Sequence, residues 1–144
     1  MRLVLDTAVM VAAIRSATGA SRRLLEIALS DQSALTLLIT VPLLIEYEAV
    51  MTRPEHLRAA RGSVNDIERL LDAVAAAAQT VDPAFLWRPG LRDADDDMVL
   101  EAAVNGRANA IVTFNIRDFE QAARRFGVDT LRPAEALKRV RGAV

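Results

Sequence analysis

The sequence predicts an α/β fold with a mainly parallel sheet of four to five strands and helices on both faces. Short apolar runs typical of buried strands alternate with longer capped or amphipathic segments typical of helices. Such alternation is characteristic of a sheet built from strand–helix–strand units. The 144 residues, 52% of them hydrophobic, match one domain with a substantial core, so we expect a single domain over 1–144.

The first half of the chain is expected to contain two buried strands and five helices. Ser21 can cap the second helix, Pro42 suits the first turn of the third, and Ser63 can cap the long amphipathic fifth. The expected strands are 2–6 and 34–40, and the expected helices are 9–16, 21–29, 42–51, a short one after 54, and 63–78.

The second half is expected to add three strands and three helices. Its prolines and a glycine make 83–93 a loop, and Gly106 is expected to end the next helix in the left-handed conformation. A further helix should end before Gly127, and Pro133 should open the last one. The expected strands are 79–82, 110–114 and 128–131, and the expected helices are 95–105, 116–125 and the segment from 133 onward.

Composition excludes several classes of protein. The net charge of −1 argues against a strongly basic nucleic-acid binder, so any nucleic-acid contact must be local. The chain has no Cys and one His, which makes zinc and thiolate chemistry poor candidates. It has no apolar run of about 20 residues and no signal-peptide pattern, so we expect a cytoplasmic protein that does not enter membranes.

Polar side chains follow two of the expected strands. Asp6 ends the first strand, while Thr113, Asn115 and Asp118 stand at or just after the segment 110–114. Ligands of parallel α/β sheets bind beyond the carboxyl ends of the strands. We therefore expect these residues to face a functional site.

Four aspartates crowd the five positions 93–97, at the entrance to an apolar helix. A helix start uses one Asp as a cap and another against the helix dipole, but more carboxylates repel one another unless a cation lies among them. Helical periodicity places Asp96 on the same face as Val99, Leu100 and Ala103. We expect Asp96 to point inward as a metal ligand, with one flanking Asp as the cap.

Each acid taken alone has a simpler explanation. Asp6 can cap the next turn, Asp96 can cap its helix, Asp118 can cap or pair with Arg117, and Glu46 can be a surface residue despite its apolar helix turn. Their joint placement at one edge of a sheet favours a site for Mg²⁺ or Mn²⁺, which prefer oxygen ligands. A Ser/His/Asp triad would need His56, which is expected to be an exposed helix residue, and no phosphate-binding P-loop occurs.

The ordered motifs resemble those of the PIN-domain ribonucleases, and more narrowly the VapC-like toxins of toxin–antitoxin pairs. The resemblance runs from about residue 2 to 137 and is carried by "LDT", "LIEYEAVMTRP", "FLWRPGLRDADDDMVLEAA" and "IVTFNIRDF". It implies a PIN-like three-layer α/β/α domain. It also implies a catalytic and metal-binding quartet of Asp6, Glu46, Asp96 and Asp118, with support from Thr7, Asp97, Thr113 and Asn115.

Two positions depart from the family pattern. Ala8 stands where the family has Asn after Asp-Thr, and Asn115 stands where an acid often follows the fourth strand. Ala8 removes a polar group that could orient Asp6 or a water, and Asn115 lowers the charge of the site. These departures bear on catalytic strength and metal affinity more than on the fold.

The resemblance implies a Mg²⁺-dependent endoribonuclease, the toxin of a type II toxin–antitoxin pair, that cuts RNA phosphodiester bonds and leaves 5′-phosphates. Arg15, Arg92 and Arg117 are candidates for holding the RNA backbone. The expected partners are an RNA substrate, an antitoxin protein and a second copy of the chain. Specific DNA binding is not expected of this chain.

Two other functions stay open. A catalytically degenerate PIN module would bind RNA or a protein without cutting, and Ala8 favours it. A phospho-accepting or phosphatase domain is disfavoured because the only lysine, Lys138, lies in the last helix and because the position two after Asp6 is not an acid.

Overall fold

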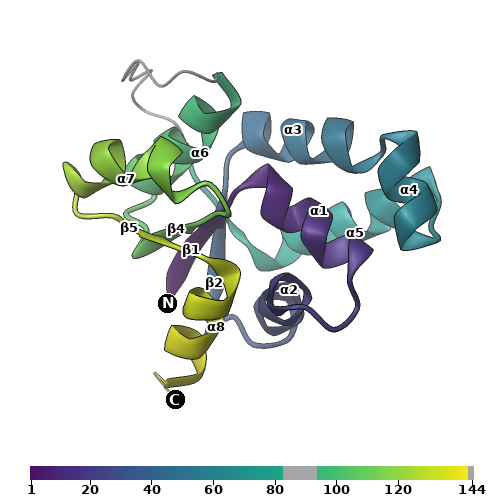
Figure 1. The fold of residues 1–144 in the computed structure, drawn as a ribbon, viewed down its shortest axis with the longest axis horizontal. Helices are drawn as coiled ribbons and strands as arrows, with labels where there is room; N and C mark the ends of the chain where they lie inside the picture. The colour runs from purple at the N-terminus through teal and green to yellow at the C-terminus, as the bar shows by residue number, and fades with distance from the viewer. Residues whose placement is uncertain (83–93, 143–144) are drawn as a thin grey trace.

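A five-stranded parallel sheet forms the centre of the computed structural model, which describes residues 1–82 and 94–142. The strand order is β3-β2-β1-β4-β5 (Figure 1). All four strand pairs are parallel, which confirms the predicted α/β class. The strands are β1 (Arg2–Leu5), β2 (Thr36–Ile39), β3 (Gln79–Thr80), β4 (Ala110–Val112) and β5 (Asp129–Leu131).

The chain winds outward from β1 in one direction and then reverses. Strands β2 and β3 extend the sheet on one side of β1, and β4 and β5 extend it on the other. Strand order therefore reverses between β1 and β4, and this is where ligands of open parallel sheets bind. The register pairs Leu5 with Val112, so the two strands end side by side.

The described residues form eight helices around the sheet. Figure 1 shows α6 and α7 on one side of the sheet and α1, α2 and α5 on the other, as predicted. Helix α8 packs against α2. The helices are α1 (Thr7–Arg15), α2 (Ala20–Ser30), α3 (Val41–Met51), α4 (Pro54–Ala60), α5 (Val64–Ala77), α6 (Ala94–Asn105), α7 (Ile116–Arg124) and α8 (Pro133–Gly142).

The amphipathic helix α5 begins and packs as its sequence predicts. Ser63 accepts a hydrogen bond from the backbone N–H of Asp66, and the Asp66 carboxylate accepts one in return from the N–H of Ser63. This capping box satisfies two donors that a helix start leaves open. Ile67, Leu71 and Val74 then face the core.

None of the described helices combines the length and apolar character needed to cross a bilayer.

Two predicted helix ends were wrong in detail. Helix α2 is capped at Gly19, and Ser21 lies buried inside the first turn. Gly106 does not adopt the left-handed conformation. The next residue, Arg107, adopts it instead, with φ of 53°. Gly106 is needed for space instead: a Cβ there would lie 2.8 Å from both Leu38 Cδ1 and Val81 Cγ2.

Candidate active site

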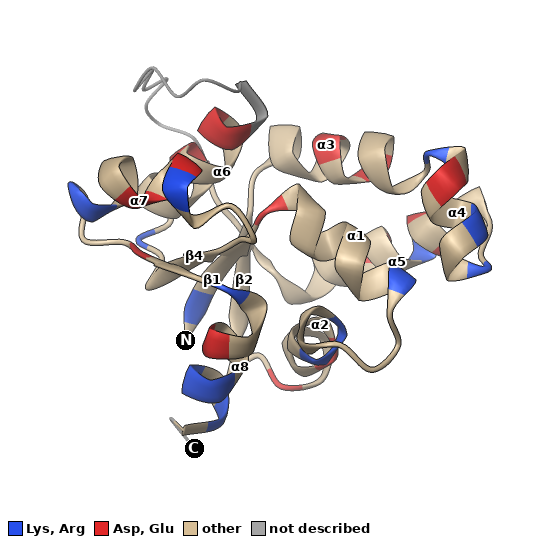
Figure 2. Cartoon of the chain, viewed as in Figure 1, with Lys and Arg blue, Asp and Glu red and all other residues tan. Residues whose placement is uncertain are grey.

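A cleft of about 340 Å³ opens at the carboxyl ends of β1 and β4 and is lined on two sides by α1 and α3. Three of the four predicted acids contribute to it. Figure 2 shows acidic residues at the start of α1, in the first turn of α6 and within α3, and basic residues where α3 meets α4. The lining residues are Asp6, Thr7, Ala8, Val11, Glu46, Val50, Arg53, His56, Asp96 and Asn115.

Asp6 is held at the junction of β1 and α1. Its backbone N–H donates to the carbonyl of Val112 at 2.9 Å, continuing the β1–β4 ladder beyond the strands. Asp6 occupies the N-cap position of α1, but its side chain makes no capping hydrogen bond. The capping explanation therefore does not account for this carboxylate, which is only 7% exposed.

Thr113 fixes the orientation of the Asp6 carboxylate. The Thr113 hydroxyl donates to Asp6 Oδ2 at 2.7 Å and accepts from the backbone N–H of Asn115 at 3.0 Å. Thr113 is fully buried. The β1–β4 register explains the contact, because the residues that follow Leu5 and Val112 lie opposite each other.

Glu46 reaches the cleft from α3, whose start is fixed by its sequence. Thr40 caps this helix by accepting from the N–H of Leu43, and Pro42 occupies its first turn as predicted. One residue after Glu46, the Tyr47 hydroxyl donates to the carbonyl of Leu5. Burial raises the pKa of Tyr47, and the charge of Asp6 raises it further, so the hydroxyl remains a donor.

Tyr47 is a buried residue that does not belong to the predicted set of site residues. Its hydroxyl joins α3 to the end of β1, immediately before Asp6. The sequence carries a weak signal for this, because a buried tyrosine generally needs a partner for its hydroxyl. Which carbonyl it reaches is a matter of tertiary structure.

Asp96 lies in the first turn of α6, partly buried, above the buried Val99, Leu100 and Ala103. This is the face that periodicity predicts. Beside it, the Oδ1 atom of Asp97 is buried and has no hydrogen-bond partner among the described residues. An uncompensated buried carboxylate oxygen is costly, so this part of the site favours a nearby positive charge.

Asp118 and two of the predicted arginines do not line the cleft. Asp118 and Arg117 are exposed in the first turn of α7, and neither is among the lining residues. Arg92 lies outside the described residues, so its predicted role has no structural test. Arg15 is exposed on α1, and its Nη1 lies 3.2 Å from Nδ1 of His56.

His56 and Arg53 are the basic lining residues that the sequence prediction missed. His56 was expected to be exposed, but it is half-buried and faces the cleft. A weak signal existed for Arg53, which follows Glu46 and Val50 at the spacing of one helix face, although α3 ends at Met51 and Arg53 is the N-cap of α4. No comparable pattern marks His56, because the packing of α4 against α1 places it.

The lining residues fit a hard divalent cation by the chemistry of their donors. Asp6, Glu46 and Asp96 offer carboxylate oxygens and Asn115 an amide oxygen, which suit Mg²⁺ or Mn²⁺. Across 1–82 and 94–142, no three His, Asp or Glu side chains already stand in a group able to hold a metal ion. The side chains of Asp6, Glu46 and Asp96 would have to move toward one another when a metal ion binds.

A comparison with protein families shows which family the chain belongs to. The PIN domain family model matches residues 2–117, which is more than half of the chain, so the chain belongs to the PIN domain family. PIN domains are typically nucleases, a class of hydrolases.

A crystal structure of VapBC2 from Rickettsia felis, bound to a DNA fragment from their promoter, is similar in fold. The TM-score is 0.58 and the sequence identity 18%, with 92% of this chain and 98% of that chain covered. No curated protein matches in a search by sequence.

Proposed function

We propose that this protein is a Mg²⁺-dependent endoribonuclease and the toxin of a type II toxin–antitoxin pair. The observation that carries the proposal is the meeting of Asp6, Glu46 and Asp96 in one cleft where the strand order of a PIN domain reverses. These acids come from three separate parts of the chain, and capping does not explain Asp6.

In the proposed reaction, one water is added across the P–O3′ bond of RNA, which leaves a 5′-phosphate and a 3′-hydroxyl. Asp6, Glu46 and Asp96 would hold the cation, with Asn115 as a neutral oxygen donor. When bound, Mg²⁺ supplies charge neutralisation at the phosphate and lowers the pKa of a water. Thr113 orients the Asp6 carboxylate, and Tyr47 fixes the backbone that carries it.

Asp118 does not line the cleft, so this proposal gives it no direct contact with the cation. Its position in the first turn of α7 favours an interaction with the helix dipole. Thr7 lines the cleft and Asp97 lies beside Asp96, so both would act by shaping the electrostatic field of the site.

The toxin assignment rests on the PIN family and on the VapBC2 fold similarity. In this proposal a small antitoxin protein covers the cleft and suppresses cleavage, and any binding to promoter DNA belongs to the antitoxin. The net charge of −1 agrees with that division, since a DNA-binding chain is usually basic.

A catalytically degenerate PIN module is the second candidate, and Ala8 favours it. Its methyl group lines the cleft where the family has an Asn side chain. Such a protein would bind RNA or a partner without hydrolysis.

RNA cleavage separates the two candidates. We would incubate the purified chain with a panel of tRNAs and rRNA fragments in Mg²⁺, in Mn²⁺ and in EDTA. Glu46→Gln removes a proposed ligand, and Glu48→Gln is its matched control, two residues along the same helix and exposed. We expect cleavage with either metal, none in EDTA, a loss of at least about 100-fold for Glu46→Gln, and no loss for Glu48→Gln.

The chemistry of the ends adds a second readout. Ligation or phosphatase treatment should find 5′-phosphates on the new ends. If the wild-type chain binds RNA but cuts none of the panel in either metal, the degenerate module is the better account. If Glu46→Gln and Glu48→Gln cut equally well, the proposed site is wrong.

A further inference from the structure

The two ends of the cleft carry side chains of opposite charge. Its acids gather where β1 and β4 end, and its basic residues, Arg53 and His56, lie at the other end, where α3 meets α4. Glu46 lies on α3, and Arg53 lies seven positions further along the chain, at the N-cap of α4. Val11 and Val50 line the stretch between the two ends. The cleft therefore has an acidic end, an apolar middle and a basic end.

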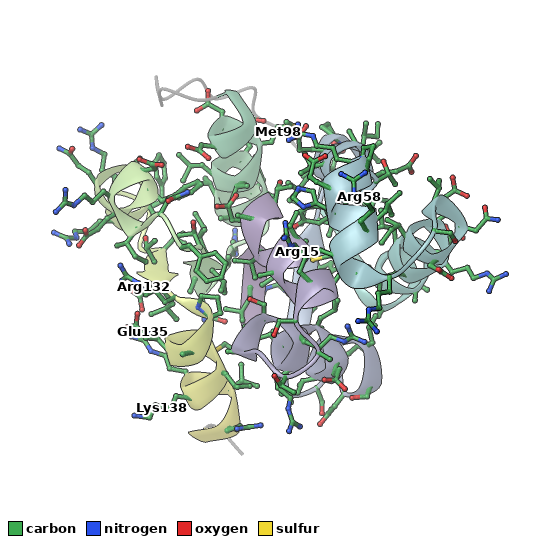
Figure 3. The ribbon with its side chains drawn as sticks, turned by 45° about the vertical axis from the view of Figure 1, so that its right-hand side comes forward. Arg15, Arg58, Met98, Arg132, Glu135 and Lys138 are labelled. Carbon is green, nitrogen blue, oxygen red and sulfur yellow. The ribbon has the colours of Figure 1, made fainter. Side chains whose placement is uncertain are left out.

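His56 is held by a residue outside the cleft. Nη1 of Arg15, on α1, lies 3.2 Å from Nδ1 of His56 (Figure 3 shows Arg15 beside α4). A guanidinium can only donate, so Nδ1 must accept. The proton of the neutral ring is then on Nε2, which leaves His56 with one N–H as a donor. Arg15 thereby fixes the tautomer that can donate to an anion.

We propose that Arg53 and His56 form a phosphate-binding rim that holds the RNA backbone beside the scissile phosphodiester, with Arg15 positioning His56. This rests on the proposed function, because it takes RNA as the substrate. Arg presents paired N–H donors that match phosphate oxygens, and a neutral His adds one more. The apolar middle of the cleft accepts a ribose or a base face.

The rim also supplies positive charge that RNA binding near the acidic end of the cleft requires. The acidic end of the cleft repels RNA, and the chain as a whole carries no excess of positive charge. Local cations must therefore hold the backbone near the acids. The rim is the basic part of the cleft lining in the described residues, and it assigns Arg15 a positioning role in place of direct contact with RNA.

The test measures binding without cleavage. The full chain carrying Asp96→Asn is titrated, in Mg²⁺, into fluorescein-labelled short single-stranded RNA of mixed sequence, at several salt concentrations. For single strands, each phosphate contact contributes about 0.7 to the slope of log affinity against log salt. We expect Arg53→Gln to lower that slope by about 0.7 and to weaken binding about fivefold, while Arg53→Lys keeps the slope.

Arg58→Gln is the matched control. Arg58 is exposed on α4, the short helix that begins just after Arg53, and it does not line the cleft (Figure 3). We expect Arg58→Gln to keep the slope and the affinity of the parent. Thermal unfolding of each variant ensures that the comparison is between folded proteins.

A double-mutant cycle tests the positioning role of Arg15. His56→Ala should weaken binding about threefold, and Arg15→Gln should weaken it to a similar extent. In the His56→Ala background, Arg15→Gln should add nothing, because Arg15 acts through the ring that is now absent. Additive effects would show that Arg15 binds RNA on its own, which contradicts this part of the proposal.

The outcomes separate the rim from the proposed function. If Arg53→Gln and Arg58→Gln change the slope equally, or not at all, while the wild-type chain still cuts RNA, the rim is wrong and the nuclease stands. If the rim variants bind RNA normally but lose affinity for the antitoxin, the rim is a protein-binding surface and the proposal is overturned. If the wild type neither binds nor cuts RNA, both proposals fall.

Discussion

At the scale of single residues, Thr113 is the clearest case of a side chain that acts on the cleft indirectly, because it orients the carboxylate of Asp6. It donates to Asp6 Oδ2 and accepts from the N–H of Asn115, so both of its functions as a hydroxyl are used. Sequence analysis could place Thr113 at a strand end. It could not supply the register that brings it against Asp6.

Replacing Thr113 by Val should therefore damage both stability and activity. The change keeps the shape of the side chain but removes a buried donor from a carboxylate, which costs about 1–3 kcal/mol. Urea unfolding should show that decrease, and RNA cleavage should slow about tenfold. Thr113→Ser keeps the hydroxyl and should retain most of the activity; equal losses for Val and Ser would show that the methyl group matters and the hydrogen bond does not.

Tyr47 gives a second prediction at this scale. Tyr47→Phe leaves the buried carbonyl of Leu5 without its donor, so the free energy of unfolding should fall by about 1–3 kcal/mol. Denaturant unfolding measures this directly. A variant as stable as the wild type would mean that the Leu5 carbonyl finds another donor.

At the scale of secondary-structure elements, the sequence predicted the existence and order of the strands and helices well. Capping residues such as Ser63 and helix-starting prolines such as Pro42 are local signals, and local signals are readable in a sequence. The two errors, at Ser21 and Gly106, have a common cause. Each residue was assigned a local role in a cap, but tertiary packing determines its actual role.

Gly106 illustrates the difference and can be tested. A Cβ at this position would lie 2.8 Å from the backbone carbonyl of Ala102 and from side chains on β2 and beyond β3. Overpacking of this kind costs about 1–3 kcal/mol, so Gly106→Ala should lower the melting temperature. Gly142→Ala is the control, because a Cβ there meets nothing within 4 Å. If both variants melt with the wild type, the close approach at Gly106 is not a packing constraint.

The capping box of α5 predicts a pH dependence. The Ser63 backbone N–H, and then its hydroxyl, hold the pKa of Asp66 below the unfolded value of 3.8. A carboxyl whose pKa is lowered on folding stabilises the protein above its unfolded pKa, and that contribution is lost as the pH falls through the folded value. The stability advantage of the wild type over Asp66→Asn should thus be complete at neutral pH, should begin to fall near pH 3.8, and should disappear once the pH is below the lower pKa of the folded state.

Thermal melts of both proteins across that range provide the measurement. Ser63→Ala, which removes the other half of the box, should cost about 1 kcal/mol at neutral pH. A constant difference between wild type and Asp66→Asn at every pH would show that charge at position 66 plays no part in the cap.

At the scale of the whole molecule, the site depends on topology. The places of Asp6, Glu46 and Asp96 in the lining of the cleft were predictable, because strand ends, helix periodicity and the family resemblance point to these residues. Asp118 carried the same motif signal, yet the fold leaves it exposed on α7 and outside the lining of the cleft. His56 reaches the cleft because α4 packs on α1, which is a long-range contact that no local pattern reveals.

The central claim is that the cleft at the β1–β4 reversal is a metal-dependent nuclease centre. The most direct test is the rate at which the wild-type chain and Asp96→Asn cleave the same RNA in Mg²⁺, with EDTA added to a parallel wild-type reaction. The account predicts rapid cleavage by the wild type, and a loss of at least about 100-fold both in EDTA and for Asp96→Asn. Cleavage by Asp96→Asn at the wild-type rate, or cleavage that continues in EDTA, would contradict it.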